Sequence, residues 1–136
     1  MLGGDHSQAI GSIRGAKQAA KDAKIIWIDA HIDANTPLSS PSRNAHGMPL
    51  SYLAGLVPLY KHWKCIDIAK DLLYFGIRSY EPEEFDLVND QGVKIFDSAD
   101  CTPDRIEDIH QEMKQVLQHH AGQKYWISFG DTPTVA

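Results

Sequence analysis

Hydrophobic and polar positions divide this chain into alternating segments. Short apolar runs, typical of strands buried in a parallel sheet, lie at 24–29, 71–77, 93–96 and 124–129. Apolar residues spaced three and four apart predict helices over 7–23 and 104–120, and proline-initiated segments predict shorter helices over 49–59 and 81–89. Because strands and helices alternate, we expect an α/β fold with helices on both faces of a mostly parallel sheet.

Two segments differ in how clearly their pattern can be interpreted. The helix over 104–120 has the clearest apolar face, which we expect to pack on the sheet through Ile106, Ile109, Met113, Val116 and Leu117. Residues 30–47 instead lack any period and carry two prolines and several serines and asparagines. Loops of this length within a compact domain are usually functional or disordered.

Composition narrows the range of partners. A chain of 136 residues with 43% hydrophobic residues fits one compact domain at most. Its formal net charge of -5 and its scattered Lys and Arg residues argue against binding to nucleic acid or to a membrane surface. No apolar run approaches the roughly 20 residues that cross a bilayer. Two cysteines and no leader-like start favour a cytoplasmic protein.

A cluster of potential metal ligands follows the first predicted strand. Asp29, His31 and Asp33 occupy alternate positions after the apolar run 25–28, so an extended backbone would project all three side chains the same way. Two carboxylates and one imidazole suit a divalent ion such as manganese. The simpler alternative is a strand whose last residues become polar as they reach water.

Two further motifs surround this cluster. Gly3-Gly4-Asp5-His6-Ser7 places His6 at the start of the first helix, where Asp5 or Ser7 can act as the N-cap. His46 lies in a loop bounded by Gly47 and Pro49, from which an imidazole could reach a site without being a ligand. Taken singly, either histidine could equally be an ordinary surface residue.

The order of these motifs resembles the ureohydrolase family, and its arginase branch most closely. The resemblance covers residues 2–129 and rests on GGDHS at 3–7, DAHIDANTP at 29–37 and S-x-N-x-HG at 42–47. It implies a three-layer α/β/α fold, a centre with two manganese ions, and a homo-oligomer. It also implies hydrolysis of L-arginine to L-ornithine and urea by a hydroxide that bridges the two ions.

The resemblance also implies roles for individual residues. His6 and Asp33 would be ligands of one manganese, His31 of the other, and Asp29 would bridge them. His46 would move protons, so we count His46 and Asp33 as catalytic residues. Substrate recognition would fall to a second set: Asn35, Ser42 and Asn44 for the α-carboxylate, Glu81 for the α-amino group, and Glu84 near the guanidinium.

The chain departs from the family pattern after its last predicted strand. Family members continue Ser-Phe with Asp-x-Asp, whereas Phe129 is followed here by Gly130, Asp131 and Thr132, so that neither family carboxylate is in register. The strand that normally precedes GGDHS is also missing. We therefore expect 1–129 to be a partial arginase-like domain and 130–136 a tail unrelated to the family. Arg43, where arginases commonly carry glycine, is a smaller departure.

Three functions remain open at this point. The first is arginase-type hydrolysis, with little or no activity expected of this chain alone because two carboxylates are missing. The second is an inactive fragment or regulatory isoform that binds metal or associates with intact subunits. The third is an agmatinase-type hydrolase, which the residues expected to read an α-carboxylate do not favour.

Overall fold

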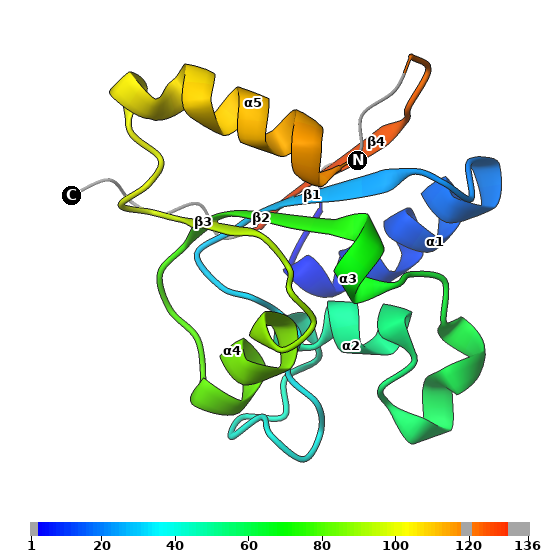
Figure 1. The fold of residues 1–136 in the computed structure, drawn as a ribbon. Helices are drawn as coiled ribbons and strands as arrows, with labels where there is room; N and C mark the ends of the chain where they lie inside the picture. The colour runs from blue at the N-terminus through cyan, green and yellow to red at the C-terminus, as the bar shows by residue number, and fades with distance from the viewer. Residues whose placement is uncertain (1–2, 118–120, 131–136) are drawn as a thin grey trace.

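Four parallel strands form the centre of the molecule. The computed structural model describes residues 3–117 and 121–130. The strand order is β3-β2-β1-β4, and every neighbouring pair is parallel (Figure 1). The strands are β1 (Lys24–Ile28), β2 (Leu72–Ile77), β3 (Ile95–Asp97) and β4 (Tyr125–Phe129). The predicted parallel α/β sheet is therefore confirmed, with strand bounds shifted by one or two residues.

Helices cover both faces of this sheet (Figure 1). One core lies between the sheet and α1 (Ala9–Ala19), α2 (Pro49–Ala54), α3 (Ile68–Asp71) and α4 (Pro82–Asn89). The opposite core lies beneath α5 (Ile106–Val116). Side chains alternate along β1, so Trp27 enters the first core and Ile26 the second. The result is a three-layer α/β/α arrangement.

Short 3₁₀ helices complete the connections. They are η1 (His6–Gln8), η2 (Ala45–Gly47), η3 (Pro58–Trp63) and η4 (Pro103–Arg105). Three of them, η1, η3 and η4, replace parts of the predicted helices. The helix expected over 49–59 ends at Ala54, because Gly55 adopts a left-handed conformation (φ 75°) that closes it, and η3 follows separately.

The expected apolar face of α5 is only partly correct. Ile109, Met113 and Leu117 pack against the sheet, but Ile106 and Val116 are 65% and 42% exposed. Successive helical residues are about 100° apart around the axis, so Val116 points away when Leu117 faces the sheet. Ile106 instead lines an apolar groove beside Phe75. Residues 118–120 of the predicted helix lie outside the described residues, as does 131–136 of the expected tail.

The carboxyl ends of β1, β2 and β4 meet at one edge of the sheet. Gly76 has a φ of 80° and interrupts the β2–β3 register, and the backbone N–H of Asp29 still bonds the Phe75 carbonyl at 3.1 Å. At the end of β4, the N–H of Gly130 bonds the Ile28 carbonyl at 3.0 Å. Polar residues that follow β1 and β4 are thereby brought together. No described helix is long and apolar enough to cross a membrane.

Candidate metal centre

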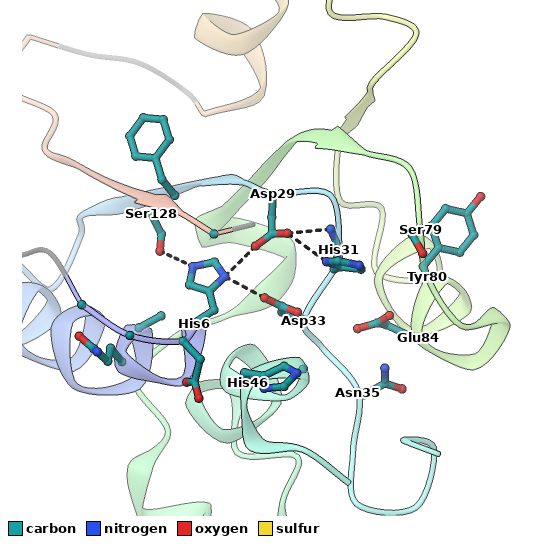
Figure 2. A pocket seen from close by; sticks show the side chains of 18 of the residues that line it. His6, Asp29, His31, Asp33, Asn35, His46, Ser79, Tyr80, Glu84 and Ser128 are labelled. Carbon is teal, nitrogen blue, oxygen red and sulfur yellow. Dashed lines mark hydrogen bonds and ion pairs between the residues drawn. The ribbon is translucent and has the colours of Figure 1, made fainter. Parts of the chain in front are cut away.

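His6, Asp29 and Asp33 converge at this edge of the sheet (Figure 2). The Nδ1 atom of His6 lies 2.7 Å from Asp29 Oδ2 and 2.8 Å from Asp33 Oδ2. One donor atom from each of the three residues lies within 4.8 Å of the others, close enough to share an ion. Residues 27 positions apart in sequence thus form one compact group.

Local structure holds His6 in place. Asp5 accepts a hydrogen bond from the Ser7 backbone N–H at 2.9 Å and caps η1, confirming it as an N-cap residue. The His6 ring stacks on Trp27 with centroids 4.0 Å apart, and its Nε2 lies 2.9 Å from Ser128 Oγ. The imidazole is therefore oriented by β1 and β4 together.

Asp33 is held by an unusual backbone conformation. Its φ is 55°, in the left-handed region that aspartate tolerates better than most non-glycine residues. Its carbonyl accepts the N–H of Leu50 at 3.1 Å, which ties the loop to the first residues of α2. This left-handed turn directs the carboxylate back towards His6 rather than along an extended strand.

The group forms a buried ion pair. Burial opposes a charge on His6, but hydrogen bonds to Asp29 and Asp33 outweigh it and raise the pKa of His6 from 6.5 to about 9. Burial raises the pKa of the Asp33 carboxyl, and the His6 hydrogen bond works against that rise. His6 Nδ1 thus faces both carboxylates at a position where a cation could bind.

His31 lies on the outer side of Asp29. Its Nδ1 is 3.3 Å from Asp29 Oδ1, and its side chain is 47% exposed. The same Oδ1 atom already accepts the His31 backbone N–H at 2.9 Å. The structure thus brings all four expected metal ligands together, with His31 more loosely placed than the other three.

A cavity of about 1000 Å³ opens from this centre. Nine of the ten residues expected at the site line it, namely His6, Asp29, His31, Asp33, Asn35, Ser42, His46, Glu81 and Glu84. Asn44 does not line it; it precedes η2, and its N–H donates to Ser42 Oγ at 3.3 Å. Ser42 and His46, which line the cavity, are exposed to solvent.

Two glutamates from the start of α4 form the other side of this cavity. Glu84 Oε1 accepts the Ala34 backbone N–H at 2.7 Å, and Asn35 Nδ2 donates to Glu81 Oε2 at 2.7 Å. Burial raises the pKa of Glu84 to about 8, nearby Glu81 adds to the rise, and the Ala34 N–H opposes it. This side of the cavity can therefore take up a cation, which would favour the ionised form of Glu84.

Sequence reasoning missed one contributor, Ser128 on β4, and named Gly130, the residue after β4, only as a departure from the family pattern. Ser128 contacts His6, and Gly130 lies so close to the group that a Cβ built on it would be 1.6 Å from Asp29 Oδ2. Both positions depend on the pairing of β4 with β1, in which Ser128 lies beside Trp27. Alternation along the last strand could have indicated that Ser128 and Gly130 share a direction, but not which group they face.

Comparison with known proteins agrees with this arrangement. Residues 1–130 match the sequence model of the Arginase family. The chain belongs to the arginase family. It is 39% identical over 132 residues to human Arginase-1 and 42% identical over 130 residues to an arginase from Neurospora crassa. These matches cover 91% and 87% of the chain but 40% and 36% of the two arginases, so the chain spans less than half the length of these relatives.

Solved arginase structures share the fold. The Glaciozyma antarctica arginase matches with a TM-score of 0.83 at 31% identity, over 94% of this chain and 48% of that one. An Entamoeba histolytica arginase in complex with L-ornithine matches with a TM-score of 0.79 at 33% identity, over 93% and 44%. The arginase-type fold predicted from the motifs is thereby confirmed for this part of the family's chain.

The donor set fits one divalent ion well. Two carboxylates and one imidazole of His6, Asp29 and Asp33 surround a common point, and they are the ligand types that borderline divalent metals accept. On the other side of Asp29, His31 Nδ1 lies 3.3 Å from Asp29 Oδ1, and His31 belongs to no group of three potential ligands among the described residues. With a divalent ion bound, the centre could polarise a water molecule beside this cavity.

Proposed function

We propose that this chain carries part of an arginase-type site, which hydrolyses L-arginine to L-ornithine and urea with the help of manganese. The convergence of His6, Asp29 and Asp33 on one point beside a large polar cavity carries this proposal. Membership of the arginase family supports it. Arginine fits the cavity chemically, because it has a cationic tail and a zwitterionic head.

The chain's own residues would prepare the metal centre. A bound divalent ion supplies a water molecule of lowered pKa as the nucleophile. Asp29 and Asp33 would offset its charge, and His6 would have to release its proton to become a ligand. Stacking on Trp27 and the Ser128 contact would keep the imidazole aimed at the ion.

The remaining residues would bind the substrate and move protons. Glu84, buried and largely protonated near neutral pH, would ionise beside a cationic group of arginine. Asn35 and Ser42 would provide short polar contacts to the head of the substrate, with Asn44 supporting Ser42 and Glu81 bonding Asn35. The exposed His46, which lines the cavity, has access to bulk water and would relay protons.

Assembly and location belong to the same proposal. We infer a homo-oligomer and a cytoplasmic protein, because the family resemblance implies the first and the free Cys65 and Cys101 thiols fit a reducing compartment. L-Arginine is the proposed small-molecule partner, with neither nucleic acid nor a membrane as a target.

A second candidate is an inactive chain that binds metal or joins intact subunits. The observation in its favour is Gly130, which faces the ligand group but brings no carboxylate to it. We expect purified chain with manganese to release little or no urea. Urea release at a rate near that of a full-length arginase would overturn this second candidate and leave the first in place.

Ligand selectivity tests the proposed site directly. L-Arginine and agmatine differ by the α-carboxylate. Each is titrated into the manganese-loaded chain in a calorimeter, and the difference in affinity measures how strongly the chain recognises the α-carboxylate. We expect arginine to bind at least about tenfold more tightly, because an unpaired polar contact costs about 1–3 kcal/mol. Asn35→Ala should reduce this preference, while Ser98→Ala, outside the cavity, should leave it unchanged. Equal affinities, or no arginine binding, would contradict the proposal.

A further inference from the structure

The number of metal ions can be inferred from the placement of the donor atoms. Among residues 3–117 and 121–130, His6, Asp29 and Asp33 are the one group of three potential ligands within 4.8 Å of one another. Their facing atoms, one imidazole nitrogen and two carboxylate oxygens, lie on one side of Asp29. This arrangement defines a single binding point.

The other side of Asp29 offers fewer ligand atoms for a metal ion. His31 Nδ1 lies 3.3 Å from Asp29 Oδ1, and that oxygen also accepts a backbone hydrogen bond from His31. An ion at this position would have these two protein donors, one of them on a side chain that is half exposed. Solvent would have to supply the rest of its coordination shell.

Gly130, the residue directly after β4, borders the ligand group without adding a ligand. A Cβ at this position would lie 1.6 Å from Asp29 Oδ2 and 2.3 Å from His6 Nδ1. The backbone of residue 130 therefore borders the ligand group directly, and the absence of a side chain lets His6 approach both carboxylates. β4 contributes the Ser128 hydroxyl, which contacts the opposite nitrogen of His6.

Charge leads to the same conclusion. The Asp29 and Asp33 carboxylates neutralise one divalent ion when His6 is neutral. A second divalent ion a few ångströms away would add two positive charges that this group does not compensate, and like charges at that separation repel strongly. The present donor set is matched to one ion.

We propose that this chain binds a single divalent cation through His6, Asp29 and Asp33, and that Gly130, which has no side chain, leaves these three ligands room to meet. This inference rests on the proposed metal-dependent function and departs from the pair of ions that the family resemblance implies. His31 then serves the site without being required for metal binding.

Metal stoichiometry tests the inference independently of activity. Equilibrium dialysis of the whole chain against Mn²⁺, followed by elemental analysis, should give one ion per chain, and electron paramagnetic resonance should show isolated Mn²⁺ without exchange coupling. Asp33→Asn should weaken binding at least about tenfold, because a neutral amide oxygen replaces the charged carboxylate. His31→Ala should retain the ion, and His62→Ala, a surface control, should be unchanged.

Each other outcome has a defined meaning. Two exchange-coupled ions per chain, or loss of the ion in His31→Ala, would overturn the single-ion inference while leaving the proposed function standing. No bound Mn²⁺ at all would overturn the metal centre and with it the proposed function. Gly130→Ala should weaken Mn²⁺ binding, because its Cβ would lie 1.6 Å from Asp29 Oδ2 and 2.3 Å from His6 Nδ1 and would displace the ligand group; undiminished binding would refute the role of Gly130.

Discussion

The charge on His6 should stabilise the metal-free fold in a pH-dependent way. The pKa of His6 rises from 6.5 to about 9 in the folded chain, because its bonds to Asp29 and Asp33 outweigh the burial that opposes the charge. A group whose pKa is raised by folding stabilises the fold fully below its unfolded pKa. The stabilisation is then lost as the pH rises through about 9.

The size of this effect follows from the two pKa values. Their difference corresponds to about 3 kcal/mol, at about 1.4 kcal/mol for each pH unit. The group borders an open cavity, so solvent screening reduces the expected contribution to about 2 kcal/mol. His6→Gln keeps a polar side chain but removes the titrating charge.

Urea denaturation with a chelator present, at pH 6 and pH 10, measures this contribution. At each pH, we take the difference in the free energy of unfolding between the native chain and His6→Gln. This difference should be larger at pH 6 than at pH 10 by about 2 kcal/mol. Other groups titrate in both proteins, so the difference isolates His6. A difference between the two proteins that does not change with pH would refute the ion pair.

Three further substitutions test the surrounding structure. Arg43 has a φ of 57°, so Arg43→Gly should raise the free energy of unfolding by about 0.5–1 kcal/mol in urea melts, whereas Arg43→Ala should give no gain. Lys17 is buried, and its Nζ lies 2.8 Å from Asp71 Oδ2, so Lys17→Ala should lower the free energy of unfolding by about 3 kcal/mol. A loss as small as that caused by Lys21→Ala, at an exposed position, would contradict the importance of this ion pair. Ile127 is 51% exposed on the edge strand β4, so Ile127→Lys should reduce self-association in sedimentation experiments, and unchanged association would exclude this surface.

The sequence predicted the sheet because its signals are local. Each strand is a short apolar run, and the alternation with helices leaves few arrangements for a parallel sheet. The sheet-facing side of α5 was less predictable. Five apolar positions were compatible with one face, but a helix lying on a flat sheet buries a narrower stripe, and Ile106 and Val116 fall outside it.

The candidate site was predicted in composition more than in geometry. Alternation placed Asp29, His31 and Asp33 on one side of an extended segment, whereas Asp33 reaches the group through a left-handed backbone that its sequence does not reveal. The contributions of Ser128 and Gly130 depend on a strand that pairs with β1 from a hundred residues away. Such long-range contacts require the register of the sheet. The roles of the individual residues stay predictions.

The central claim is that His6, Asp29 and Asp33 hold a metal ion beside a cavity that binds arginine. A manganese anomalous-difference map from crystals of this chain grown with MnCl₂ and L-ornithine tests it most directly. We predict one peak bonded to all three side chains, with the amino acid in the adjoining cavity. A map with manganese only at other residues, or with none at this group, would contradict the account.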